Sequence, residues 1–313
     1  MKSFWTLKKE AIFITGGSGF IGSHLVHFLS KENHRVISLI RDLLPNSWLS
    51  VALKDAVQVR GSLNNFALLK RVLNEYEIKQ VYHLGAQAIV TTAKNDPINT
   101  FDTNVMGTVN LLEASRQLDV SQIVVLITDK IFGNRMNARE YDPYDAVDMY
   151  STSKICQDLV CDSYARSYGM QIARVRACNQ YGLDYNHRII PNTIRACLED
   201  KSPVIYKGEE ESKRQYMYVE DLVSGLDWIM KLGYKGAFNL ATQDVLTQEE
   251  VVLKILELKE FEGIKPTYIQ RTKPQQAEAQ SLKQSDLGSW KPLYNFDRGI
   301  RETLNRYLKF GCY

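Results

Sequence analysis

Residues 11–25 read Ala-Ile-Phe-Ile-Thr-Gly-Gly-Ser-Gly-Phe-Ile-Gly-Ser-His-Leu, and this stretch decides the fold. Its opening apolar residues predict a buried strand, and the apolar residues from Phe20 to Leu29 recur at helical spacing. Gly16 permits a tight turn, Gly19 lets backbone N–H groups approach a pyrophosphate, and Gly22 lets the helix pack against the strand. The start of the helix adds a partial positive charge. We therefore predict a dinucleotide-binding turn rather than a plain strand–turn–helix unit.

The composition narrows the class of protein. The chain has 313 residues, of which 44% are hydrophobic and 24% are charged, as in an ordinary globular protein with a substantial core. A net charge of +3 is too small to indicate nucleic acid or an anionic membrane as a partner. No apolar run approaches the roughly 20 residues of a membrane span. Residues 1–10 lack the apolar core of a signal peptide.

The cysteine pattern indicates a reducing compartment. Five cysteines form no Cys-x-x-Cys pair, which favours reduced structural thiols in a cytoplasmic protein and disfavours a metal site. They are Cys156, Cys161, Cys178, Cys197 and Cys312.

The first half of the chain alternates strands and helices. Further strands are predicted at 35–40, 57–59, 80–84, 123–127 and 171–175, and helices at 66–77, 103–117 and 150–168. This alternation predicts an α/β fold, a Rossmann-type doubly wound parallel sheet with its ligand crevice at the carboxyl ends of the strands.

The alternation ends near residue 177, where prolines begin to separate shorter elements. We predict a dinucleotide-binding domain over 1–177, to which 215–241 returns with a strand at 237–240. A smaller C-terminal substrate lobe then comprises 178–214 and 242–313.

The end of the second predicted strand bears on the choice of cofactor. An acid there would bind the adenosine ribose of NAD, whereas an arginine would accommodate the 2′-phosphate of NADP. The chain carries both, Arg41 and Asp42, which as an alternative are two solvated loop charges. We expect NAD(P), with NADP slightly favoured because Arg41 can bind a phosphate.

A tyrosine and a lysine in the middle of the chain suggest proton transfer. Tyr150 and Lys154 are four residues apart, on one face of a predicted helix. A nearby ammonium favours the phenolate and lowers the pKa of a tyrosine, so the pair can take a proton from a sugar or alcohol hydroxyl. Tyr141 and Tyr144 have no lysine at the same spacing.

Several motifs together resemble one family, the extended short-chain dehydrogenases/reductases that include the nucleotide-sugar epimerases and dehydratases. The motifs are the glycine turn, Tyr150 with Lys154, His83-Leu-Gly-Ala-Gln87, Asn104 with Gly107-Thr108, Arg176-Ala-Cys-Asn-Gln-Tyr-Gly182, Arg214-Gln-Tyr-Met-Tyr-Val-Glu-Asp221 and Trp290-Lys-Pro292. The resemblance covers nearly the whole chain. It implies a sheet of about seven strands, a tightly held nicotinamide cofactor and an NDP-sugar in the crevice.

The resemblance also implies which residues line the site. The cofactor is expected to contact Gly16, Gly19, Phe20, Ile21, Gly22, Arg41, Asp42, Leu63, Leu84, Gly85, Ala86, Asn104, Tyr150 and Lys154. The substrate is expected to contact Gln87, Asn179, Arg188 and Arg214. Capping, a surface ion pair and a helix-face charge are the alternatives for the last three residues.

The stretch after the fifth strand separates the activities of this family. Thr128 is at the position of the hydroxyl residue that binds the reacting C4 oxygen. Simple 4-epimerases continue with small uncharged residues, whereas 4,6-dehydratases place an acid/base pair there. Asp129-Lys130 resembles the CDP-glucose 4,6-dehydratases and the inverting UDP-N-acetylglucosamine 4,6-dehydratases. Ile21 and His24 depart from the CDP-glucose pattern, which has Lys and Trp at these positions.

We therefore expect an NDP-sugar 4,6-dehydratase with Thr128, Asp129, Lys130, Tyr150 and Lys154 as its catalytic residues. Tyr150 takes the C4 hydroxyl proton, Lys130 removes the C5 proton and Asp129 protonates the leaving C6 hydroxyl. An ordinary polar loop is the alternative for residues 128–130. A 4-epimerase or reductase and a non-enzymatic cofactor-binding regulator are the other functions considered. The resemblance also implies a homodimer through helices 103–117 and 150–168.

Overall fold

A computed structural model describes residues 10–43, 47–207, 212–270 and 279–311. Residues 1–9 and Cys312, which bear on the predictions of targeting and cysteine state, lie outside these ranges. The four cysteines that are described are free thiols: Cys156, Cys161, Cys178 and Cys197.

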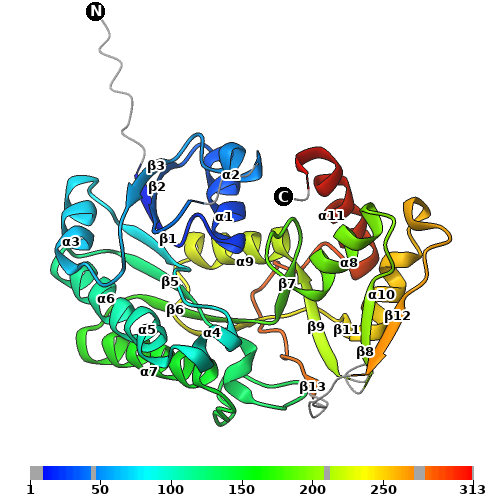
Figure 1. Ribbon diagram of the computed structural model, residues 1–313. Helices are drawn as coiled ribbons and strands as arrows, with labels where there is room; N and C mark the ends of the chain where they lie inside the picture. The colour runs from blue at the N-terminus through cyan, green and yellow to red at the C-terminus, as the bar shows by residue number, and fades with distance from the viewer. Residues whose placement is uncertain (1–9, 44–46, 208–211, 271–278, 312–313) are drawn as a thin grey trace, which may run out of the picture.

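The molecule is built around a seven-stranded parallel sheet (Figure 1). Its strands are β1 (Ala11–Thr15), β2 (Arg35–Ile40), β3 (Val57–Arg60), β4 (Gln80–His83), β5 (Gln122–Leu126), β6 (Ile172–Ala177) and β10 (Gly236–Leu240). The order is β10-β6-β5-β4-β1-β2-β3. The predicted doubly wound sheet is confirmed, and the predicted strand at 237–240 pairs with β6. The order reverses between β1 and β4, which is where such sheets bind ligands.

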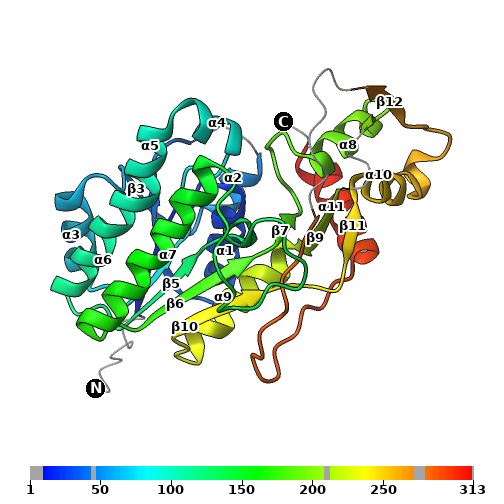
Figure 2. The ribbon, with the colours of Figure 1, turned by 90° about the horizontal axis from the view of Figure 1, so that it is seen from below.

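Helices cover both faces of this sheet (Figure 2). α1 (Phe20–Lys31) and α9 (Val219–Lys231) pack together on one face, while α3 (Phe66–Glu75), α6 (Gly107–Gln117) and α7 (Met149–Tyr168) pack side by side on the other. Since both faces are covered, β1 is buried throughout, as a continuous apolar run requires.

The helix predicted over 103–117 is more complex than the sequence indicated. α4 (Val90–Asn95) and α5 (Pro97–Phe101) lead into a π-helical turn at Asp102–Met106, and α6 follows without a break. Wide turns of this type are frequent at functional sites. Asn104, a predicted cofactor residue, is buried within the turn.

A second lobe holds two small sheets. β7 (Asn179–Tyr181), β11 (Val245–Thr247) and β13 (Ala279–Gln280) each pair with β9 (Lys213–Tyr218), and β8 (Val204–Lys207) pairs with β12 (Thr267–Gln270). The helical elements of the lobe are α8 (Ile189–Leu198), α10 (Gln248–Leu256), the 3-10 turn Lys259–Phe261 and α11 (Phe296–Phe310). A separate hydrophobic core holds these elements together and includes Trp48 of α2 (Ser47–Ala52).

The two lobes are continuous with each other in sequence. β9 belongs to a small sheet, yet α9 begins at the next residue, Val219, and packs against the main sheet. The boundary predicted between 214 and 215 therefore falls inside β9. The domain limits derived from the sequence remain a proposal.

Candidate active site

The glycine turn has the close packing that its sequence predicted. Gly16 has φ +76°, a conformation that favours glycine. A Cβ atom on Gly22 would lie 2.0 Å from the Gly16 carbonyl oxygen, so α1 packs directly on the turn. Gly19 is the N-cap residue of α1 and has no side chain to cap the helix, and the first helical turn contains no acidic residue. This arrangement fits a phosphate at the helix N-terminus.

The residues after β3 and β4 that are predicted to contact the cofactor lie at the carboxyl end of the sheet. A Cβ atom on Gly16 would lie 2.8 Å from the Gly85 Cα, so the turns after β1 and β4 touch. Leu63 packs beside Gly85 and Gly107, and its side chain is buried. Leu84 and Ala86 flank Gly85 and are half-buried.

Phe20 and Ile21 begin α1 and pack against the core of the second lobe. The guanidinium of Arg188 lies 5.9 Å from the centre of the Phe20 ring. The start of α1 therefore lies between the predicted cofactor and substrate residues.

Arg41 and Asp42 form an exposed ion pair at the end of β2. The Arg41 Nε donates to the Asp42 carboxylate over 2.6 Å, and about two thirds of each side chain is exposed. Asp42 thus neutralises the cation on which the preference for NADP rests.

Thr128, Asp129 and Lys130 follow β5 directly. Thr128 begins the short 3-10 turn Asp129–Phe132, and its hydroxyl donates to Asp129 Oδ1 over 3.1 Å. The other oxygen, Asp129 Oδ2, is buried and accepts no hydrogen bond from the described residues. Burial raises the pKa of Asp129, against the opposing charges of Lys130 and Arg214.

The pKa of Lys130 shifts in the opposite direction to that of Asp129. Burial lowers the pKa of Lys130 and the Arg214 charge lowers it further, while the Asp129 and Asp148 carboxylates oppose the shift. Both members of the pair are therefore displaced toward their neutral forms.

Tyr150 is buried in the first turn of α7. Asp148 caps this helix by accepting from the Ser151 N–H over 2.7 Å, and Ser151 completes a capping box. The Tyr150 phenol lies near Thr128, at the end of β5. Burial raises the pKa of Tyr150 to about 12, and the nearby Thr128 side chain opposes this shift.

Lys154 does not act on Tyr150 in the way expected from the sequence. Its ammonium donates to the Leu126 carbonyl over 2.9 Å and to the Gln157 side chain. Burial lowers the pKa of Lys154 to about 8. The expected lowering of the Tyr150 pKa is absent because burial of the phenol outweighs every opposing interaction.

Asn104 links the loop after β4 to α7. Its side chain accepts from the Gln87 N–H over 2.7 Å and donates to Ser153 Oγ over 2.9 Å. The Gln87 side chain is bound to the Ile89 backbone and to Thr100 Oγ1. Gln87 is therefore held within its own loop.

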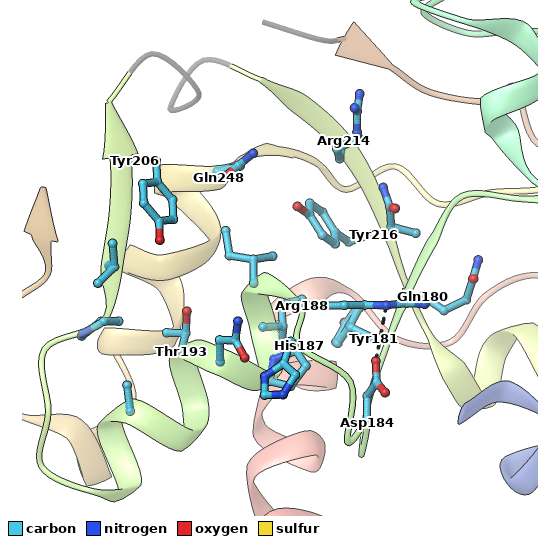
Figure 3. Close-up of a pocket in the computed structure, with 18 of the residues that line it drawn as sticks. Gln180, Tyr181, Asp184, His187, Arg188, Thr193, Tyr206, Arg214, Tyr216 and Gln248 are labelled. Atoms are coloured by element: carbon cyan, nitrogen blue, oxygen red, sulfur yellow. Dashed lines mark ion pairs between the residues drawn. The ribbon is translucent and has the colours of Figure 1, made fainter. Parts of the chain in front are cut away.

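A cavity of about 580 Å³ lies in the second lobe (Figure 3). Asn179, Arg188 and Arg214, three of the four predicted substrate residues, line it, whereas Gln87 does not. The Arg188 Nε lies 3.7 Å from the Asp184 carboxylate. The catalytic candidates are outside the lining, but electrostatic interactions connect Arg214 to Asp129 and Arg188 to Tyr150.

Sequence reasoning missed several residues of this cavity. Tyr206 and Gln248 lie on the opposite side of it from Gln180 and Asp184 (Figure 3). Tyr216 was predictable, since it is two residues after Arg214 on β9 and alternate residues of a strand share a face. The elements that carry Tyr206 and Gln248 meet only in the folded lobe.

Comparison with known proteins agrees with this geometry. The family described as GDP-mannose 4,6 dehydratase matches residues 13–303. The chain belongs to this family. The CDP-glucose 4,6-dehydratase of Salmonella typhimurium is 30% identical, over 99% of the chain and 92% of that protein. The chain spans only 62% of another relative, the dTDP-D-glucose 4,6-dehydratase of Dictyostelium discoideum.

Solved structures with the same fold include dehydratases and epimerases of this family. The dTDP-glucose 4,6-dehydratase of Bacillus anthracis, in complex with NAD, has a TM-score of 0.83 and 27% identity over 96% of the chain and 97% of its own. The UDP-glucose 4-epimerase of Thermus thermophilus, also with NAD, has a TM-score of 0.84 and 26% identity over 95% and 99%.

These findings confirm the predicted fold and the predicted enzyme family, whose members use nicotinamide cofactors on nucleotide sugars. Within the described ranges, no helix is both long enough and apolar enough to cross a membrane.

Proposed function

We propose that the protein is an NDP-sugar 4,6-dehydratase, which converts an NDP-hexose to the NDP-4-keto-6-deoxyhexose. The supporting observation is the Asp129–Lys130 pair at the end of β5, whose pKa values burial moves in opposite directions. These shifts favour a protonated carboxyl group and a neutral amine, which are the acid and base that a water elimination needs.

The first step proceeds at Thr128 and Tyr150. Their side chains lie close enough to interact, so both can contact one sugar hydroxyl. Thr128 binds the C4 oxygen, and Tyr150 takes the C4 hydroxyl proton once it is ionised. A nicotinamide held at this site would supply the redox chemistry, as the carrier of the hydride that C4 loses and C6 gains. The glycine turn and Lys154 would hold this cofactor.

The elimination uses Asp129 and Lys130. The 4-ketone acidifies the C5 proton, which Lys130 removes, while Asp129 donates its proton to the C6 hydroxyl, and water leaves. Lys130 then returns its proton to C5 as C6 is reduced. Tyr150 has then gained one proton and Asp129 has lost one, so the cycle closes when Tyr150 releases a proton to solvent and Asp129 takes one up. Each positioned proton transfer contributes about 10²–10⁴-fold to the rate.

The cavity of the second lobe is the proposed site of the nucleoside diphosphate. Arg188 and Arg214 supply two guanidinium groups, which form strong hydrogen bonds to phosphate oxygens. We propose a CDP-glucose-like substrate, which the Salmonella relative supports by name.

The cofactor preference is a further proposal. Arg41 supports NADP, but its ion pair with Asp42 and the NAD of two related structures support NAD. Titration of the apoprotein with each cofactor, repeated with Arg41→Leu, tests this choice. A preference for NADP that depends on Arg41 would support the original expectation.

We also propose a homodimer through α6 and α7 in the cytoplasm. Two apolar side chains that are each about half exposed support this proposal, Met106 at the end of the π-helical turn before α6 and Leu159 on α7. Leu159→Glu is expected to yield monomers in analytical ultracentrifugation, whereas Leu232→Glu, at an exposed position on the other face, is expected to leave the oligomeric state unchanged.

A 4-epimerase is the second candidate. Thr128, Tyr150 and Lys154 are sufficient for oxidation and reduction at C4, and the Thermus structure shows that epimerases share the fold. Incubation with a panel of NDP-sugars separates the candidates. A dehydratase gives an alkali-detectable 4-keto product without added reductant, an epimerase gives a stereoisomer, and a regulator gives no product. A stereoisomer or no product would overturn our proposal.

A further inference from the structure

Gln157 of α7 has no role in the mechanism above, but it is buried against Lys154. We propose that Gln157 is a positioning residue, which holds the Lys154 ammonium and connects it to the dinucleotide-binding turn through Thr108 and His83. The side chains of all four residues are at least 97% buried. Only the turnover measurements used to test this proposal depend on the proposed function.

The protein itself binds two of the three N–H groups of the Lys154 ammonium. One donates to the Leu126 carbonyl over 2.9 Å, at the end of β5, and another donates to Gln157 Oε1. One N–H group is left for the cofactor and the phenol. Gln157 thereby determines the direction in which the remaining donor of Lys154 points.

The proton positions beyond Gln157 follow from the geometry. The Thr108 hydroxyl donates its single proton to the Asn104 carbonyl over 2.7 Å. Thr108 Oγ1 must therefore accept its other two hydrogen bonds, from Gln157 Nε2 and from His83 Nε2, each over 2.9 Å. A flipped Gln157 amide would oppose its NH₂ group to the Lys154 ammonium. Only one orientation satisfies both neighbours.

The same reasoning determines which ring nitrogen of His83 carries the proton. His83 carries its proton on Nε2, so Nδ1 accepts from Thr15 Oγ1 over 2.7 Å. Thr15 in turn accepts from the Gly85 N–H over 3.0 Å. Burial lowers the pKa of His83 to about 3, which keeps the ring neutral. The turns after β1 and β4 are thus connected to Lys154 through a fully ordered path.

Three other titratable groups interact with Lys154. The carboxylate of Asp158 and the thiol of Cys161 raise its pKa, and His83 faces it as a neutral ring. Asp158 is bound to Arg174, Arg176 and Tyr144 and is not a counter-ion for Lys154 alone. The amide of Gln157 is therefore a neutral acceptor that stabilises the ammonium without fixing its charge.

The test is Gln157→Met, which keeps the volume of the side chain but removes both polar groups. We expect affinity for NAD, titrated into the apoprotein, to fall about tenfold or more. We also expect kcat to fall with little change in KM for the sugar. Because Lys154 loses an acceptor for its ammonium, its pKa falls further, and the alkaline limb of the pH profile moves to lower pH.

Control variants separate this role from a loss of packing. Gln117→Met makes the same change at an exposed position of α6 and is expected to behave as wild type. Thr108→Val is expected to reproduce the Gln157→Met defect, and Thr108→Ser to restore wild-type affinity. Thermal unfolding identifies any variant that has lost its fold.

Nitrogen NMR of the ¹⁵N-histidine-labelled wild-type protein tests the path directly. A neutral His83 with its proton on Nε2, unchanged at pH 5, is expected. The Nδ1-protonated form, or wild-type NAD affinity with an unshifted pH profile in Gln157→Met, would overturn the proposal. Neither NAD titration nor NMR requires dehydratase activity, so these results stand if the proposed function fails.

Discussion

Two ends of the candidate active site differ in how completely the protein satisfies their polar atoms. Around Lys154, the side chains of Gln157, Thr108 and His83 are connected by a continuous series of hydrogen bonds. At Asp129, one buried carboxyl oxygen accepts no hydrogen bond from the described residues. The first region is organised by the protein alone, whereas the second leaves an acceptor that a substrate hydroxyl can satisfy. A buried acceptor without a hydrogen bond lowers the stability of the folded protein, and such sites are common where a protein carries out chemistry.

The largest expected effect comes from the incomplete end. Asp129→Asn and Lys130→Met are each expected to lower 4-keto product formation by about 10²–10⁴-fold, since each removes one proton transfer. Oxidation at C4 should continue, because Tyr150 and Thr128 are intact, and reduced nicotinamide should accumulate in a single-turnover assay. Lys235→Met, at an exposed lysine, is the matched control. Undiminished turnover in both site variants would refute the roles assigned to the pair.

A smaller effect is expected from the cavity of the second lobe. Arg188→Leu removes one charged donor, and such hydrogen bonds contribute about 1.5–3 kcal/mol. We expect KM for the NDP-sugar to rise about tenfold or more with kcat largely retained. Arg301→Leu, on an exposed part of α11, serves as the control. An unchanged KM would show that Arg188 is only a helix-face charge.

Two glycine variants in the turn after β1 separate an effect on stability from an effect on dinucleotide binding. The Cβ atom in Gly22→Ala would lie 2.0 Å from the Gly16 carbonyl oxygen, so we expect a loss of about 1–3 kcal/mol in stability. In Gly19→Ala the nearest atom, the Gly16 carbonyl oxygen, is 3.2 Å away, a tight contact but a milder one, so the loss of stability should be smaller while affinity for the dinucleotide falls. Thermal unfolding and NAD titration measure the two effects. Equal losses of stability in both variants would contradict these separate roles.

The smallest expected effect is on stability as a function of pH. Burial raises the pKa of Asp129 in the folded protein, so the folded state binds this proton more tightly than the unfolded state does. Its contribution to stability is present at low pH and is lost as pH rises through the folded pKa. Asp129→Asn should therefore raise Tm at pH 7 by a few degrees, the shift that about 1 kcal/mol produces. The gain should shrink toward pH 4.

Asp119→Asn makes the same change at an exposed carboxylate and should leave Tm unchanged at both pH values. A gain in Tm for Asp129→Asn that persists undiminished at low pH would mean that the raised pKa is not its cause.

Much of the main sheet was predictable because its strands are continuous apolar runs that end at glycine or polar turns. β1 and the turn at Gly16 illustrate this, since buried parallel strands leave few alternatives. Candidate site residues could be proposed from the sequence where they are close together in it, as in Thr128–Lys130 and Tyr150 with Lys154. Tyr206 and Gln248 were not, since their elements meet only through tertiary packing.

The ionisation of Tyr150 shows a second limit of sequence reasoning. Its spacing from Lys154 was read correctly, but spacing does not reveal the acceptors that the ammonium finds. Leu126 and Gln157 take those hydrogen bonds, and burial of the phenol then determines its pKa. The π-helical turn around Asn104 was equally invisible, because its residues have ordinary helical propensities.

The pairing of β10 with β6 has a consequence for how the protein is made. During synthesis β6 emerges well before β10, and until then its outer backbone groups form an open edge that can pair with another chain. A fragment that stops at Ala177 would keep this edge permanently. Such a truncated chain is expected to aggregate, even though it contains the whole nucleotide-binding motif.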